Sequence, residues 1–383
     1  MAPQRPLDTA STAQIDTAIQ AHVTERKLPG AVYRMEHAGA VYQHAYGKLS
    51  YEAGSADVDL DTVYDAASLS KVVSTAPSVL ILAQEGKISL DAKLVDYFPE
   101  CANGGKETIT IRQLLTHSSG MPASLPARPA WRGDTAAHVL ACSQTVTNPP
   151  GTFFRYSDIN YLLLGQLVQR VSGMPLSAFA QQRIFTPLGM HSTGYLPLGR
   201  FVQSRIAPTQ KAPAVDGDKT AHWDLPPEAV QQGVVHDPTA RFIGGVAGSA
   251  GVFTTAGDLA RYARMLLNGG ELDGVRVLSA ESVRLLTTTQ SPPGLAKRAL
   301  GMDIDSPYAR PRGSIFPVGS FGHTGFTGCI LWVDPASKTF YVFLSNRVYP
   351  DDKSNVLPLY GVLGTLTAQA AGLSAPSAPR SGE

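Results

Sequence analysis

The chain has 383 residues, of which 43% are hydrophobic and 16% are charged, and its formal net charge is +1. This length allows one large domain or two interleaved ones, and the apolar content is ample for a packed core. The charges form no basic or acidic block, which argues against nucleic acid or an anionic membrane surface as a partner.

No apolar run approaches the length that spans a bilayer, so no membrane span is expected. The first residues, 1–6, lack the apolar core of a signal peptide. The sequence as it stands therefore predicts a cytoplasmic location, and a periplasmic or extracellular one if a leader has been removed.

The three cysteines, Cys101, Cys142 and Cys329, are too few and too scattered to predict a disulfide framework. We interpret all three as structural. The chain contains no C-x-x-C, H-E-x-x-H or H-x-x-E-H spacing, so neither a metal nor a cofactor is predicted. The G-x-S-x-G motif of nucleophile-elbow hydrolases is also absent.

Strand patterns occur near both ends of the chain. Two β-rich runs, 31–35 and 40–46, flank Ala38-Gly39 like a hairpin, and runs 327–333 and 339–344 flank a second turn. A helix over about 355–371 follows the second hairpin.

The middle of the chain is helical and rich in loops, with a helix over about 158–172. Residues 197–242 show little periodicity, and either a lid over a pocket or a plain surface insertion would explain them. Residues 244–251 are rich in glycine without a phosphate-binding motif, which indicates close backbone packing.

These patterns predict an α+β fold with an antiparallel sheet built from both chain ends and flanked by helices. We expect residues 12–90 and 245–372 to form the sheet domain, and residues 91–244 to form an inserted, mostly helical domain. A Ser/Pro/Ala tail over 373–383 is expected to be disordered.

The sequence Ser68-Leu69-Ser70-Lys71 precedes a run of apolar residues at helical spacing, in which Pro77 predicts a kink or local break. Ser68 and Lys71 would share one helical face, where the lysine amine can take the serine proton if burial lowers its pKa. Free backbone N–H groups at the helix start could stabilise an oxyanion. Such pairs also occur by chance, and Ser68 could simply be an N-cap.

Three further fragments occur in a fixed order: 114–120 (LLTHSSG), Tyr156-Ser157-Asp158 and His323-Thr324-Gly325. Together with Ser-x-x-Lys they resemble the serine β-lactamase and penicillin-binding-protein superfamily over about residues 12–370. The branch is that of class C β-lactamases, D-alanyl-D-alanine carboxypeptidases and family VIII esterases. Segments 235–248, 322–328 and 345–347 look like a narrower branch that includes exo-acting N-acetylmuramyl-L-alanine amidases.

The resemblance implies that Ser68 is the nucleophile. Lys71 would take its proton, or would hold Tyr156 as a phenolate that does so. The backbone N–H groups of Ser68 and Phe326 would form the oxyanion hole.

The same resemblance implies that four residues bind substrate, namely Asp158, His323, Thr324 and Gly325. The turn at His117 and Ser118 would support the fold.

The chain departs from the superfamily pattern at two of these positions. Asp158 stands where the second motif usually ends in Asn, and His323 stands where the third usually begins with Lys. Asp351 and Ser354 align loosely with an Asn and an Arg that bind a substrate carboxylate in class C enzymes. We therefore expect a less positive cleft, which weakens the case for β-lactams as substrates.

The resemblance implies a serine hydrolase that cleaves an amide or ester through an acyl-enzyme. Its small-molecule or peptide substrate could be a cell-wall peptide or a small carboxylic ester. The alternatives are a sensor of β-lactams or muropeptides that acylates without turnover, and a weak β-lactamase. The sequence does not fix the substrate or the oligomeric state.

Overall fold

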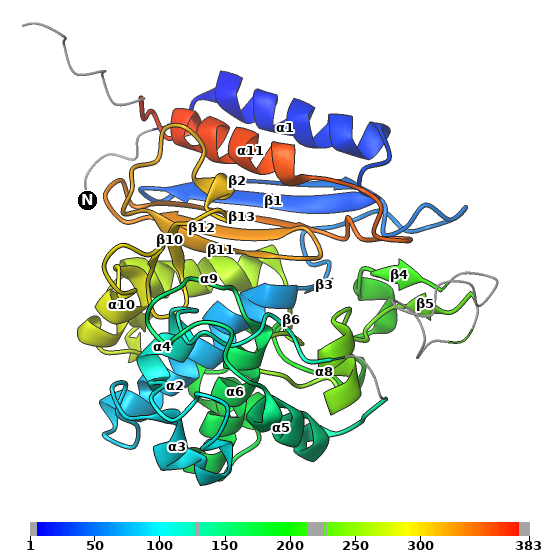
Figure 1. Cartoon of the computed structure of the whole chain (residues 1–383). Coiled ribbons are helices and arrows are strands. Elements are labelled where there is room, and N and C mark those ends of the chain that lie inside the picture. The colour runs from blue at the N-terminus through cyan, green and yellow to red at the C-terminus, as the bar shows by residue number, and fades with distance from the viewer. Residues whose placement is uncertain (1–5, 127–129, 213–225, 227, 375–383) are drawn as a thin grey trace, which may run out of the picture.

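The computed structural model describes residues 6–126, 130–212, 226 and 228–374. A sheet lies between two layers of helices, and both ends of the chain contribute to it (Figure 1). Helices α1 (Thr9–Thr24) and α11 (Leu357–Ala370) cover one face, and helices from the middle of the chain lie beyond the other. This arrangement confirms the predicted fold class. The domain boundaries stay a prediction.

The large sheet has seven strands in the order β2-β1-β13-β12-β11-β10-β9, and every neighbouring pair is antiparallel. Its strands are β1 (Gly30–His37), β2 (Ala40–Gly47), β9 (Lys297–Arg298), β10 (Asp303–Asp305), β11 (Phe321–Gly325), β12 (Cys329–Asp334) and β13 (Thr339–Ser345). Both predicted hairpins, β1–β2 and β12–β13, are confirmed.

The central strands are buried on both faces, so their side chains alternate between two cores. On β12, Ile330 and Trp332 pack under α1 and α11, whereas Leu331 and Val333 face the helices from the middle of the chain. The core that contains Leu331 and Val333 is the larger of the two, and it surrounds the segment that carries Ser68.

The remaining helices are α2 (Ala76–Gln84), α3 (Leu94–Tyr97), α4 (Ile111–Leu115), α5 (Asp134–Ser143), α6 (Asp158–Ser172), α7 (Leu176–Ala180), α8 (Pro238–Ile243), α9 (Ala256–Leu267) and α10 (Ala280–Thr287). Short strand pairs join β3 (Tyr64–Asp65) to β6 (Phe253–Thr254), β4 (Gln210–Lys211) to β5 (Val230–Gln231), and β7 (Glu271–Leu272) to β8 (Val275–Arg276).

Two predicted segments overlap residues outside the described part of the chain. Of the 197–242 segment, residues 213–225 and 227 lie outside it, and the lid stays a prediction. Of the predicted disordered tail, residues 375–383 lie outside it. Among the described residues, no helix is both long and apolar enough to cross a membrane.

One expectation about the cysteines was wrong. Cys101 and Cys142 form a disulfide, and Cys329 is a buried free thiol. The two bonded cysteines are 41 positions apart in the sequence, and the fold brings their Cα atoms to 4.5 Å. Their spacing carried no signal of this pairing.

The glycine-rich segment 244–251 packs its backbone closely against α6, as predicted. A Cβ atom built on Gly248 would lie 1.9 Å from the backbone oxygen of Tyr161 and 2.9 Å from the backbone nitrogen of Gly165. Neither backbone atom can move without displacing α6, so only glycine fits at this position.

We expect Gly248→Ala to lower the free energy of unfolding by about 2–3 kcal/mol or more, because the new methyl group overlaps backbone atoms. Urea denaturation measures the change. Gly257→Ala is the matched control, since its Cβ would lie 3.9 Å from the nearest atom outside its chain neighbours and helix backbone. Equal destabilisation by the two substitutions would contradict the packing argument.

Candidate active site

Ser68 lies in a tight turn directly before the buried helical segment. Residues Ala67–Leu69 form a 3-10 turn, Lys71–Thr75 form a π-helical turn, and α2 begins at Ala76. Pro77 is therefore at the start of α2, where its missing N–H costs little. The helix is irregular not at Pro77, as predicted, but just before it, in the π-helical turn Lys71–Thr75.

The turn is fixed by a buried carboxylate. Asp65 accepts the backbone N–H of Ala67 at 2.8 Å and that of His236 at 2.6 Å. Burial raises the pKa of Asp65 to about 6, although both hydrogen bonds oppose this rise. Ala67 adopts a left-handed backbone conformation with φ of 46°, a strained state that such contacts can maintain.

Lys71 lies directly behind Ser68 and is fully buried. Its Nζ donates to Ser68 Oγ at 3.0 Å and to the backbone oxygen of Ser249 at 2.9 Å, and it forms an ion pair with Asp158 Oδ1 at 2.7 Å. The predicted pair is thus assembled, and Asp158 joins it instead of lining the pocket.

The expected fall in the pKa of Lys71 does not occur. Burial acts to lower this pKa, but the attraction of Asp158 and Tyr156 outweighs burial and holds it above its ordinary value. Lys71 is therefore a cation in this structure and has no lone pair with which to accept a proton.

Tyr156 is half-buried and faces the same site. Lys71 Nζ lies 4.9 Å from the centre of its ring, and the guanidinium carbon of Arg298 lies 5.9 Å from it. The ring stacks on His117 at 4.3 Å, and His117 Nδ1 accepts the backbone N–H of Ser157 at 3.0 Å. The structure confirms that His117 supports the fold, since it orients the segment that carries Tyr156.

Strand β11 forms the opposite wall and carries the His323-Thr324-Gly325 motif. A Cβ on Gly325 would lie 2.4 Å from the backbone oxygen of Ala66, so only glycine lets the strand approach the Ser68 turn this closely. Phe326 follows the strand, and its side chain is 54% exposed. Its backbone oxygen accepts from Arg347 Nε at 2.9 Å and Nη2 at 2.7 Å.

His323 is buried and neutral. Its Nδ1 lies 2.8 Å from the backbone oxygen of Thr324 and must donate, which leaves Nε2 with a lone pair. Burial, together with the positive charges of Arg298 and Lys71, holds the pKa of His323 well below its ordinary value. No hydrogen-bond partner of Nε2 occurs among the described residues.

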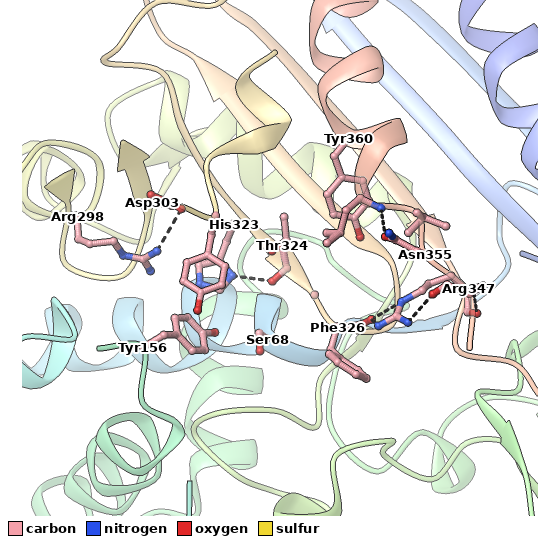
Figure 2. Close-up of a pocket in the computed structure, with 15 residues that line it drawn as sticks. Ser68, Tyr156, Arg298, Asp303, His323, Thr324, Phe326, Arg347, Asn355 and Tyr360 are labelled. Carbon is pink, nitrogen blue, oxygen red and sulfur yellow. Dashed lines mark hydrogen bonds and ion pairs between the residues drawn. The ribbon is translucent and has the colours of Figure 1, made fainter. Parts of the chain in front are cut away.

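A cavity of about 340 Å³ lies above Ser68 between these walls (Figure 2). Figure 2 shows Arg298 and Asp303 at one end, Ser68 in the middle, and Arg347 and Asn355 at the other end. The lining residues are Ser68, Tyr156, Arg298, Asp303, Tyr308, His323, Thr324, Gly325, Phe326, Arg347, Ser354, Asn355, Val356, Leu357 and Tyr360.

Two arginines in this lining were missed by the sequence analysis, and each lies close to a carboxylate, so the expectation of a less positive cleft stays a prediction. Arg298 is fully buried, 3.3 Å from Asp303 Oδ2, and its Nη2 donates to the backbone oxygen of Gly301. Arg347 also pairs with Asp352. Of the two loosely aligned residues, Ser354 lines the cavity, whereas Asp351 pairs with Lys353.

Comparisons with known proteins agree with this architecture. A family model described as beta-lactamase matches residues 15–363. A protein of Escherichia coli (strain K12), provisionally named a D-alanyl-D-alanine carboxypeptidase, is 32% identical over 335 residues, which cover 80% of this chain and 75% of that protein.

Two solved structures share the fold at 20% sequence identity. A class C beta-lactamase has a TM-score of 0.70 and covers 94% of this chain and 96% of its own. EstCE1, a hydrolase with promiscuous acyltransferase activity, has a TM-score of 0.71 and covers 94% of this chain and 98% of its own. The chain therefore belongs to the beta-lactamase family and is a serine hydrolase.

Proposed function

We propose that this serine hydrolase releases the C-terminal residue of a short peptide through an acyl-enzyme on Ser68. The observation that carries the proposal is the 3.0 Å contact between Ser68 Oγ and Lys71 Nζ at the floor of the cavity. Attack by Ser68 Oγ on the scissile carbonyl would form the acyl-enzyme and expel the leaving amine, and water would then release the acid.

Tyr156 is the proposed base in both steps. Lys71 is already protonated through its contact with Asp158, so another group must accept the proton of Ser68. The Tyr156 ring has two cations near it: Lys71 Nζ lies 4.9 Å from its centre and the guanidinium carbon of Arg298 lies 5.9 Å from it. As the base, Tyr156 would accept the Ser68 proton and would later give it to the leaving group.

The backbone N–H groups of Ser68 and Phe326 are the proposed oxyanion hole. Supporting this, each neighbouring peptide is held by a charged group: Asp65 fixes Ala67, and Arg347 fixes the carbonyl of Phe326. Donors that are oriented before substrate binds stabilise developing charge without reorganisation in the transition state.

The provisional name of the 32% identical relative supports a peptide with a free carboxylate as the substrate. The cavity offers the hydroxyl of Thr324 and the positive charge of Arg298 on the side of Tyr156. A small carboxylic ester is the second candidate. It is favoured by the apolar lining at the other end, where Val356, Leu357 and Tyr360 could accept an alkyl group.

We expect Ser68→Ala to reduce turnover by at least about 10⁴-fold, because no other nucleophile replaces the hydroxyl. The assay panel contains a peptide ending in D-Ala-D-Ala, p-nitrophenyl esters, a MurNAc-peptide and nitrocefin. Release of D-Ala at the highest kcat/KM supports the carboxypeptidase, and preference for an ester supports the second candidate. Unchanged turnover by the folded variant would refute the Ser68 assignment.

The pH profile tests the role of Asp158. Without its carboxylate, burial dominates and the pKa of Lys71 falls. If the charge of Lys71 is required, the alkaline loss of kcat/KM should move at least about 1 pH unit lower in Asp158→Asn.

Asp158→Glu is the matched control, since it keeps the negative charge and should keep the wild-type profile. The measurement is kcat/KM on one substrate between about pH 6 and pH 10. An alkaline limb that stays in place in Asp158→Asn would contradict the assignment of Lys71 as an obligatory cation.

A further inference from the structure

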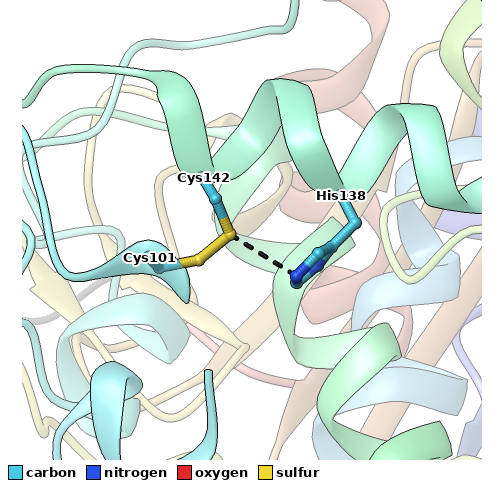
Figure 3. A group of neighbouring side chains, drawn as sticks. All are labelled: Cys101, His138 and Cys142. Carbon is cyan, nitrogen blue, oxygen red and sulfur yellow. Dashed lines mark hydrogen bonds between the residues drawn. A yellow bond between two sulfur atoms is a disulfide. The ribbon is translucent and has the colours of Figure 1, made fainter. Parts of the chain in front are cut away.

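A second cluster of reactive side chains lies outside the cavity, where the 3-10 helix Pro99–Cys101 meets α5 (Figure 3). Cys101 is bonded to Cys142, and Cys142 Sγ lies 3.5 Å from His138 Nε2. The ligand atoms of these three residues all lie within 4.8 Å of one another. Both sulfur atoms belong to buried residues.

The elements that carry this cluster bring three ligand groups within 4.8 Å of one another, and a carboxylate lies beside one of them. His138 and Cys142 are four positions apart on α5 and therefore share a face of the helix. Glu100 precedes Cys101 in the facing turn, and its Oε1 lies 2.8 Å from His138 Nε2. Two sulfurs, an imidazole nitrogen and a carboxylate oxygen make up a donor set that suits Zn²⁺.

His138 is oriented as a metal-binding histidine usually is. Its Nδ1 lies 2.8 Å from Gln166 Oε1, and Gln166 Nε2 donates to Asp134 Oδ1 at 2.9 Å, which fixes the orientation of the amide. Nδ1 therefore carries the hydrogen, and Nε2 faces the sulfurs. Such outer contacts fix the tautomer and raise the basicity of the ligating nitrogen.

Glu100 adds a negative charge beside Nε2. Arg170 Nη2 donates to Glu100 Oε1 at 2.8 Å and so holds this carboxylate in place beside His138. A carboxylate oxygen and an unprotonated imidazole nitrogen repel at 2.8 Å. The nitrogen must therefore hold a proton or a metal ion.

We propose that Glu100, Cys101, His138 and Cys142 form a redox-gated Zn²⁺ site, closed while the disulfide is intact and competent once it is reduced. A phosphine reductant supplies two electrons and becomes a phosphine oxide with the oxygen of one water molecule, the S–S bond breaks, and the two protons of that water complete the thiols. Zn²⁺ then displaces both thiol protons and the Nε2 proton, which pass to water, and binds the two sulfurs and Nε2. The site shares no residue with the cavity, so it does not depend on the proposed function.

Geometry and charge both fit this ion. Zn–S distances of about 2.3 Å and Zn–N distances of about 2.0–2.1 Å place the two ligand atoms about 3.6 Å apart in a tetrahedron. Cys142 Sγ and His138 Nε2 are already 3.5 Å apart. The negative charges of two thiolates and Glu100 would be balanced by Zn²⁺ and Arg170.

The test is a titration of the full chain with Co²⁺, a spectroscopic substitute for Zn²⁺, before and after reduction by a phosphine. Reduced protein should bind one Co²⁺ with a thiolate-to-metal charge-transfer band and tetrahedral d–d bands, and Zn²⁺ should bleach them. Oxidised protein should show neither. A thiol count under denaturing conditions checks the starting state, which should expose one thiol before reduction and three after it.

Variants separate the ligands from the remaining thiol. Cys101→Ser and Cys142→Ser should abolish the charge-transfer band, whereas Cys329→Ser should keep it. His138→Gln retains both thiols and should weaken binding by at least about 10–100-fold, the loss already seen when outer-shell partners of a metal ligand are removed. Far-ultraviolet circular dichroism checks the fold of each variant. If the cysteine variants do not fold, the affinity of His138→Gln for Co²⁺ is the measurement that tests the site.

Absence of a charge-transfer band in reduced wild-type protein would overturn the proposal, as would a band that survives both cysteine substitutions. If reduction alone unfolds the chain, Zn²⁺ should restore the native circular dichroism, and failure to restore it would count against the site.

Discussion

The buried charge of Lys71 is the interaction on which the site depends. An ammonium group without partners costs several kcal/mol to bury, so the fold must supply partners to it. Asp158 at the start of α6, the backbone oxygen of Ser249 and the hydroxyl of Ser68 do so, and they come from three distant parts of the chain. The contacts that stabilise the buried ammonium group are therefore the same contacts that place the reactive groups of the site next to one another.

The departures from the superfamily motifs move charge around this cation. Asp158 adds a negative charge next to Lys71, and neutral His323 removes a positive charge from β11. Arg298 on β9 returns a positive charge to the same end of the cavity, and its field helps to keep His323 neutral. The charge of the motif residues on β11 alone therefore does not predict the charge of the cleft, because residues on other strands, such as Arg298 on β9, also contribute to it.

The sequence predicted what local patterns encode. Ser68 and Lys71 are three residues apart, and the β1–β2 and β12–β13 hairpins each consist of two β-rich runs on either side of turn residues, so each was found. The apolar pattern does not mark β11 as a strand, because Gly322, Thr324 and Gly325 interrupt it, and only the family resemblance places the His323-Thr324-Gly325 motif on a strand. The disulfide and the role of Arg298 depend on contacts that only the folded chain creates, and the pKa of Lys71 depends on which of burial and Asp158 dominates.

The peptides beside the candidate oxyanion hole are held by charges on opposite sides of the cleft. Asp65 holds the strained Ala67 before Ser68, and Arg347 uses two of its N–H groups on the carbonyl of Phe326. With these donors committed to the protein itself, Arg347 has little capacity left to bind a substrate anion. Its position beside the cavity is thus better explained by rigidity than by recognition, since a fixed peptide N–H stabilises a developing oxyanion without moving.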